Sequence, residues 1–304
     1  MADARAGVGW AGQAVSEPLG PVPGGVSIRC DGRIPGHTRL TVSPLKHQPE
    51  TMVAHMERPC VVWPESAAEL QALQQRLAAV AETVSPWVPP AGRQPVIGAV
   101  FCAHRRGSPG PGAAGEPIWL GAVLMRGRAV VDRVTLRSLT GAEYSPGLLA
   151  LREGPALEAA ARALRSAPDV LLVDATGRDH PRGCGLALHL GARLGIPTVG
   201  VTDRPLMAEG PVPEATSGSA AELRLGGAVV GHQLRSVTGA RPVAVHAGWR
   251  TSPEVALAVA RLALLHHRTP EPLREARRIA RALRNEETRA GCGGVQRRFP
   301  DEHP

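Results

Sequence analysis

The chain has 304 residues and a formal net charge of +8, from 35 Lys and Arg residues against 27 Asp and Glu residues. This length allows one large domain or two small ones with a buried core. The charge excludes an acidic solvating tail and permits a polyanionic partner. Lys46 is the single lysine. A bias toward arginine fits a GC-rich coding sequence as well as selection for guanidinium chemistry, so it identifies no partner by itself.

Several protein classes are excluded by pattern. No apolar run approaches the roughly 18 residues that a membrane helix needs, and the opening MADARAGVGWAGQ lacks the features of a secretory signal. The five cysteines are odd in number and widely spaced, without a CxxC pair, which argues against a zinc ribbon or a disulfide framework. We therefore expect a reduced, cytoplasmic location and no membrane partner. The sequence indicates no oligomeric state.

Residues 1–62 carry little periodicity and much Gly, Pro, Ser and Thr, which predicts a disordered or loosely attached extension. Met52 and Met56 lie near its end, so a translation start downstream of Met1 stays open. Order begins where Ser66 is followed three residues later by Glu69 and an amphipathic stretch. This spacing is typical of a capping box and predicts a helix over 66–82.

Three apolar runs follow. VIGAVFCA (96–103) has the length of a buried strand, and a Gly- and Pro-rich loop (107–117) separates it from strand-like runs at 118–125 and 129–139. The sequence RGR supplies a short turn between the last two runs. The three strands are therefore predicted to form an antiparallel meander.

The second half alternates helical and apolar patterns. We expect helices over 146–166 (broken at Gly154-Pro155), 181–194, 252–267 and 271–286, strands over 168–177, 196–202 and 243–248, and a hairpin over 222–236. Such alternation favours a mostly parallel sheet in this half, with helices on both faces. The predicted architecture is one α/β domain over 63–288 with a flexible tail over 289–304.

In open α/β sheets, functional sites gather at the carboxyl ends of the strands. Asp174 ends the run VLLV there, where it either meets a cation or substrate or caps a loop. Glu153 interrupts an apolar helical stripe, and a carboxylate is costly to bury unless it is paired or bound to metal. His180 and His189 also have structural explanations. His180 can cap the helix that follows it, and His189 can be a half-buried helix histidine.

Taken together, the motifs that carry these residues identify a protein family. EYSPGLLALREGPALEAA (143–160), followed by PDVLLVDATGRDHPRGCGLALHLGARLGIPTVGVTDRPL (168–206), resembles endonuclease V, a family of deoxyinosine-recognising nucleases with a ribonuclease H-like fold. The resemblance runs colinearly from about residue 63 to 284. It implies a mixed sheet in which an antiparallel three-strand meander is followed by parallel strands.

The resemblance implies a metal-dependent hydrolase that nicks DNA or RNA at the second phosphodiester on the 3′ side of inosine, with Mg²⁺ (or Mn²⁺) held by carboxylates. Glu153 and Asp174 match the metal ligands, and with His180 they are the expected catalytic residues. The expected nucleic-acid contacts are Tyr144, Pro146 and Gly147, which match a wedge that enters the duplex, together with Gly177 and His189. Asp169 matches the acid that opens the same strand as Asp174.

Departures from the family pattern fall in the same region. Val100 stands at the position of the family's central aspartate, Asp203 at its lysine, and Trp249 and Thr176 at two histidines. A valine offers no ligand atom, and losing a metal-bridging carboxylate costs roughly a thousandfold or more in rate. Asp203 adds negative charge where the scissile phosphate would lie.

Replacement ligands stay open as alternatives. Cys102 shares the strand face of Val100, but a thiolate is a poor Mg²⁺ ligand. His104 offers a site for a softer ion such as Mn²⁺ or Zn²⁺, and Asp203 offers a carboxylate from a neighbouring strand end. Three functions follow: a nucleic-acid-binding family member with weakened or lost cleavage, an active Mg²⁺- or Mn²⁺-dependent endonuclease, and a repurposed α/β domain that binds a small ligand or a protein.

Overall fold

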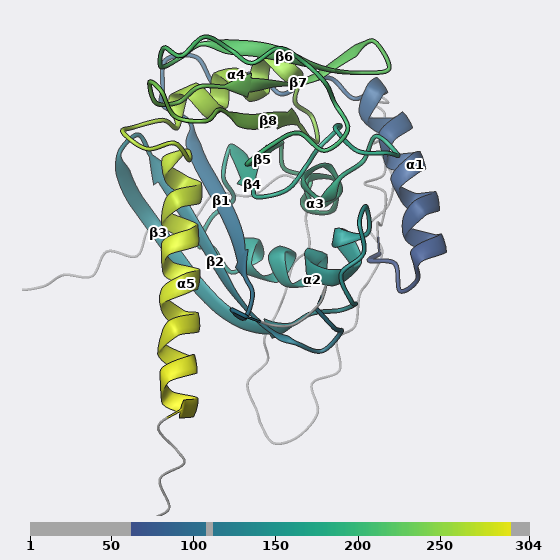
Figure 1. Cartoon of the computed structure of the whole chain (residues 1–304), viewed down its shortest axis with the longest axis vertical. Helices are drawn as coiled ribbons and strands as arrows, with labels where there is room; N and C mark the ends of the chain where they lie inside the picture. Colours follow the sequence, from purple (N-terminus) through teal and green to yellow (C-terminus); the bar gives the residue numbers. More distant parts are fainter. Residues whose placement is uncertain (1–61, 108–111, 293–304) are drawn as a thin grey trace, which may run out of the picture. The chain divides into compact units, whose positions relative to one another are not determined.

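The computed structural model describes residues 62–107 and 112–292. The predicted extension over 1–62 therefore lies almost wholly outside the described residues, as does most of the predicted tail. Within the described residues, eight strands form one sheet in the order β3-β2-β1-β4-β5-β8-β7-β6 (Figure 1). No helix of this part is long and apolar enough to cross a membrane.

The elements follow the predicted order along the chain. The strands are β1 (Val96–Ala103), β2 (Pro117–Arg126), β3 (Ala129–Leu139), β4 (Val170–Val173), β5 (Thr198–Thr202), β6 (Ala220–Leu225), β7 (Ala228–Leu234) and β8 (Val243–Ala247). The helices are α1 (Ala67–Thr83), α2 (Leu149–Arg162), α3 (Leu186–Leu194), α4 (Pro253–Leu262) and α5 (Glu271–Cys292).

The sheet is mixed. β1 pairs antiparallel with β2, and β2 with β3, so the predicted meander is confirmed. β4 runs parallel to β1 and to β5, which forms the parallel part of the sheet. The expectation of a mostly parallel second half is wrong for β8, because β8 pairs antiparallel with β5 and with β7. The hairpin of β6 and β7 is confirmed.

Local capping sets the start of α1. The Ser66 hydroxyl accepts a hydrogen bond from the Glu69 amide at 3.2 Å, and the Glu69 carboxylate accepts one from the Ser66 amide at 3.3 Å. The capping box predicted from this spacing is therefore present. It satisfies backbone donors that the first helical turn leaves free.

Two predicted helices differ in extent. α2 runs unbroken through Gly154-Pro155, and the Trp63 ring packs directly on Gly154. Tertiary packing thus outweighs the intrinsic cost of these two residues. The helix predicted over 181–194 begins only at Leu186, since residues 181–185 form a turn after His180.

Helices cover both faces of the sheet, as predicted. Alternate strand residues pack against α1, α2 and α3 on one face, where Val100, Leu171 and Val173 lie, and against α4 and α5 on the other. Figure 1 shows α5 running alongside β1 and β2. Gly121 of β2 permits this close packing, because a Cβ there would lie 2.2 Å from the Ala276 carbonyl oxygen of α5.

Candidate functional site

A cavity of about 280 Å³ opens at the carboxyl ends of β1 and β4, bordered by α2 and α5. We call it the first cavity. It brings together Glu153 and Asp174, both predicted as metal ligands, with Val100 and Asp203. Its full lining is Val100, Phe101, Cys102, His104, Leu149, Glu153, Leu157, Asp174, Asp203, Arg277 and Arg281.

A second cavity of about 200 Å³ adjoins the first and shares Leu149 and Asp174 with it. Of the predicted nucleic-acid contacts, Tyr144, Pro146 and Gly147 line this cavity, together with His180 and Thr176. The Tyr144 side chain is 46% exposed, which leaves its ring available to a partner. Asp174 therefore lies at the junction between a charged cavity and the segment that carries the tyrosine.

Asp174 follows β4 directly, which places its carboxylate at the end of two parallel strands. Arg277 of α5 lies 3.3 Å from it, measured from Nη2 to Oδ2. Burial raises the pKa of Asp174 above its ordinary value, and the charges of Asp203 and Glu153 add to the rise while Arg277 opposes it. The carboxylate that the resemblance assigns to a metal is thus held by an arginine of this same chain.

Glu153 comes from α2 and is buried, with a relative exposure of 8%. Its Oε1 lies 2.7 Å from Nε2 of His104, which in turn lies 3.6 Å from Sγ of Cys102. Ligand atoms of these three residues all lie within 4.8 Å of one another. Burial raises the pKa of the Cys102 thiol well above its ordinary value, and the charge of Glu153 adds to the rise.

Magnesium does not fit this donor set. Mg²⁺ demands near-octahedral oxygen ligands, whereas Val100 is fully buried in the wall of the cavity and offers none. Asp174 is engaged by Arg277, and Glu153 is hydrogen-bonded to an imidazole. Beside the two carboxylates stand a thiol and an imidazole, which prefer softer ions.

Two arginines of α5, Arg277 and Arg281, line the first cavity together with the carboxylates of Glu153, Asp174 and Asp203. The guanidinium groups of Arg277 and Arg281 lie 5.2 Å and 5.6 Å from the centre of the Phe101 ring, in cation–π geometry. Burial lowers the pKa of Arg281, and the neighbouring charges of Arg277 and Arg106 add to this effect. The two guanidinium groups therefore give the cavity a positively charged wall on α5, beside its carboxylates. The sequence signal is the four-residue spacing on an arginine-rich helix, which identifies no role by itself.

Asp203 lies at the rim of the first cavity. Its carboxylate is 70% exposed and accepts a hydrogen bond from Nη1 of Arg268 at 2.5 Å. This bond lowers the pKa of Asp203. The side chain is therefore directed to an arginine outside the cavity lining, and the carboxylate stays ionised.

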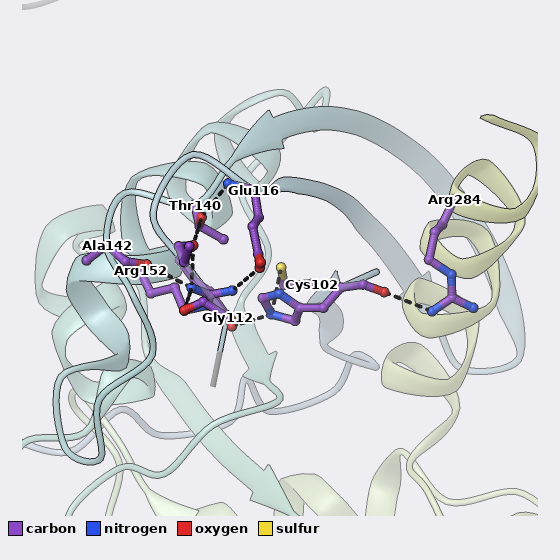
Figure 2. A network of polar contacts seen from close by, with 10 residues as sticks. Cys102, Gly112, Glu116, Thr140, Ala142, Arg152 and Arg284 are labelled. Atoms are coloured by element: carbon purple, nitrogen blue, oxygen red, sulfur yellow. Dashed lines mark hydrogen bonds and ion pairs between the residues drawn. The ribbon is translucent and has the colours of Figure 1, made fainter. Parts of the chain in front are cut away.

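A network around Arg152 orders the chain beside Tyr144. Nη1 of Arg152 donates to the carbonyl oxygens of Gly112 at 3.2 Å and Ala142 at 2.8 Å, and Nη2 contacts Glu116 at 3.0 Å (Figure 2). The Tyr144 amide donates to the same Gly112 carbonyl at 3.0 Å. One buried guanidinium thus fixes both the loop at Gly112 and the segment that leads into the tyrosine.

The carbonyl oxygen of Gly147 receives three side-chain donors. Gln74 of α1 donates at 3.2 Å, Nε2 of His180 at 3.2 Å and Nη2 of Arg182 at 2.8 Å. Because the Arg182 amide donates to Nδ1 of His180, the imidazole proton sits on Nε2. Burial, with the charge of Arg182, lowers the pKa of His180 to about 4. His180 is thus a neutral positioning residue for the Tyr144 segment in this arrangement.

Three residues singled out in the sequence line neither cavity. His189 is fully buried against Trp63, with ring centroids 4.4 Å apart. Gly177 packs against the end of β8, where a Cβ would come within 2.0 Å of the Ala247 carbonyl oxygen. Trp249 packs among residues of α1 and α3.

Two further aspartates have structural partners. Asp169 opens β4 at the end opposite Asp174, and both of its oxygens bind Arg93 at 2.7 Å. Asp179 is fully buried and accepts hydrogen bonds from the amides of Leu206, Met207 and Ala208 at 2.7–2.8 Å. Sequence reasoning missed Asp179, although it holds the segment that brings Leu206 to the second cavity.

Comparisons with known proteins agree with one another. A sequence model described as Endonuclease V matches residues 115–278. The chain is 40% identical to "Endonuclease V" of Thermus thermophilus over 193 residues, covering 62% of this chain and 83% of that protein. The crystal structure of Endonuclease V from Streptomyces avermitilis is 33% identical with a TM-score of 0.66, covering 74% of this chain and 96% of that one.

A third similarity concerns a complex. Endonuclease V of Ciona intestinalis, solved with a 24mer DNA that contains an inosine followed by a ribo-adenosine, is 20% identical with a TM-score of 0.60. The match covers 74% of this chain and 100% of that one. At this identity, the similarity speaks for a shared fold.

Proposed function

Because this chain belongs to the endonuclease V family, we propose that it binds inosine-containing nucleic acid and that its own phosphodiester cleavage is weakened or lost. The observation that carries this proposal is the pairing of Asp174 with Arg277 in a cavity where Val100 supplies no ligand. A guanidinium neutralises the carboxylate without supplying the Lewis acid that phosphodiester hydrolysis needs. The cysteine pattern favours a cytoplasmic setting.

Binding is supported by charge and by shape. Arg277 and Arg281 offer guanidinium groups at the carboxyl ends of the parallel strands, and arginine binds phosphate oxygens well. The exposed Tyr144 ring stands on a segment that three donors fix through the Gly147 carbonyl. An exposed aromatic near two guanidinium groups suits stacking on an unpaired base together with phosphate contact.

The binding test measures fluorescence anisotropy of the full chain with inosine-containing DNA and RNA strands across a salt series. Each phosphate contact contributes a slope of roughly −0.7 to −0.9 in log affinity against log salt. Arg277→Ala with Arg281→Ala is expected to reduce the slope by about 1.4–1.8. Arg289→Ala, which removes one positive charge at the exposed far end of α5, is expected to change the affinity little. A flat titration at low salt for the wild type would overturn the proposal and favour a repurposed domain.

The cleavage test compares two isosteric changes. Val100→Asp supplies a carboxylate at the family's metal position, whereas Val100→Asn supplies a polar group of the same size without the charge. Each is combined with Asp203→Lys and assayed for nicking of an inosine-containing strand with Mg²⁺ or Mn²⁺. We expect nicking only in the Val100→Asp combination. Nicking by the wild type that is lost on Asp174→Ala would overturn the claim of weakened cleavage.

That outcome would support the second candidate, an active Mg²⁺- or Mn²⁺-dependent endonuclease. The observation in its favour is that Asp174 and Glu153 line one cavity, where they would be the two carboxylate ligands. The poor match between the whole donor set and Mg²⁺ is why we rank this candidate second.

A further inference from the structure

A cluster of three potential metal ligands, Cys102, His104 and Glu153, lines the first cavity. Of these, only Glu153 matches a magnesium ligand of the family. Cys102 is the penultimate residue of β1, His104 follows directly after the strand, and Glu153 faces them from α2. The geometry points to a zinc site formed by Cys102, His104 and Glu153, with a fourth coordination position open to the cavity. The site stands on its own geometry and does not depend on the function proposed above.

The distances suit tetrahedral zinc. With a Zn–S bond of about 2.3 Å and a Zn–N bond of about 2.1 Å at tetrahedral angles, the sulfur and nitrogen atoms lie about 3.6 Å apart. Sγ of Cys102 and Nε2 of His104 are 3.6 Å apart. Glu153 Oε1 lies 2.7 Å from the same nitrogen as a hydrogen-bond partner, and coordination widens this distance to about 3.4 Å. Oε1 also lies within 4.8 Å of Sγ, so an adjustment of the Glu153 carboxylate completes the site.

The ligand types select the ion. A thiolate, an imidazole and a carboxylate together suit Zn²⁺ and its spectroscopic substitute Co²⁺, whereas Mg²⁺ prefers oxygen ligands alone. As the ion binds, the thiol proton of Cys102 leaves to solvent. The proton that His104 Nε2 donates to Glu153 gives way to the Zn–N bond, and the neutral imidazole then carries its single proton on Nδ1, by exchange with solvent. Three protein ligands with one open position distinguish this site from closed structural zinc sites.

The surroundings hold the ligands and admit the ion. Nη1 of Arg284 on α5 donates to the His104 carbonyl oxygen at 3.2 Å, which fixes the segment that follows β1 (Figure 2). Arg152, next to Glu153 on α2, is held by the carbonyl network shown in the same figure. The His104 side chain is 37% exposed and the Glu153 side chain 10%, so the imidazole side of the cluster is open to solvent.

The test uses the full chain, stripped of metal with a chelator and titrated with Co²⁺ and then Zn²⁺. We expect one equivalent of Co²⁺ to produce tetrahedral d–d bands and a near-ultraviolet thiolate-to-cobalt band, both abolished by Zn²⁺ and unaffected by millimolar Mg²⁺. Cys102→Ala is expected to remove the thiolate band and to weaken Zn²⁺ binding by about 100-fold or more. The matched control is Cys184→Ala, because Cys184 is a buried free thiol among residues of α1 and α3; the thiolate band is expected to remain.

The other three cysteines are present in both cysteine variants. A difference between Cys102→Ala and Cys184→Ala therefore assigns the thiolate ligand to Cys102. His104→Ala is expected to weaken Zn²⁺ binding, and because it also removes the imidazole partner of the buried Glu153 carboxylate, the binding is titrated at a temperature where the metal-free variant is folded. The inference is overturned by an unchanged cobalt spectrum in Cys102→Ala, by loss of the band in Cys184→Ala, or by the absence of a thiolate band in the wild type.

Discussion

The buried imidazole of His189 allows a direct test of the structure through protein stability. Its imidazole is fully buried in α3 and stacks on Trp63, and neither ring nitrogen has a hydrogen-bond partner among the described residues. Burial lowers its pKa to about 4. We therefore expect His189→Leu to stabilise the protein, because it replaces an unpaired polar ring in a core with an apolar side chain of similar volume.

The size of the effect depends on pH. At pH 7, removing the two unpaired nitrogens is expected to raise the free energy of unfolding by about 1–3 kcal/mol. Loss of the aromatic contact with Trp63 offsets about 0.5–1.5 kcal/mol of this gain. As the pH falls below the unfolded value of about 6.5, the unfolded wild type binds a proton at His189 that the folded state refuses until about pH 4. At about 1.36 kcal/mol per pH unit, the wild type loses about 2 kcal/mol relative to the variant by pH 5.

Urea unfolding of the wild type and of His189→Leu, at steps from pH 7 to pH 4.5, measures this difference directly. His189→Gln supplies a second comparison, since glutamine does not titrate and is expected to show the same pH-dependent part with a different offset at pH 7. A difference in stability that stays constant over this range would refute the reasoning. Because His189 lines neither cavity, affinity for an inosine-containing strand is expected to stay within about twofold, a change below about 0.4 kcal/mol.

Three other changes have defined outcomes. Gly177→Ala is expected to cost about 2 kcal/mol or more in calorimetry, because its Cβ would lie 2.0 Å from the Ala247 carbonyl oxygen; a shift in melting temperature near zero would contradict the close approach. Ser66→Ala removes the cap of α1 and is expected to cost about 1 kcal/mol in urea unfolding, and equal stability would show the cap to be unimportant. Arg182→Ala removes the shortest donor to the Gly147 carbonyl and is expected to weaken nucleic-acid binding about tenfold in anisotropy, whereas unchanged affinity would separate this contact from binding.

The parts of the fold that depend on neighbouring residues were predictable from the sequence. The capping box at Ser66, the meander of β1 to β3 and the β6–β7 hairpin are all set by spacing within a few residues. The convergence of Glu153 and Asp174 followed from a resemblance that preserves both motifs. Each of these features carries its signal in a short stretch of chain.

The rest depends on contacts between distant residues. The direction of β8 is set by its pairing with β5, and the continuity of α2 through Gly154 by packing of Trp63. The pairing of Arg277 with Asp174 joins residues 103 positions apart, and no local pattern announces it. Likewise, the isolation of His189 from both cavities is a consequence of how α3 lies against the segment that precedes α1.

Gly121 has an effect that reaches beyond packing. The Ala276 carbonyl that packs against Gly121 belongs to the residue directly before Arg277. The distance between β2 and α5 at this position therefore sets how far the Arg277 guanidinium reaches toward Asp174. Any side chain at position 121 would lift α5 from β2 and withdraw its positive charge from the strand ends. A substitution in the apolar interior can therefore change the charge around Asp174 while every charged residue of the site stays the same.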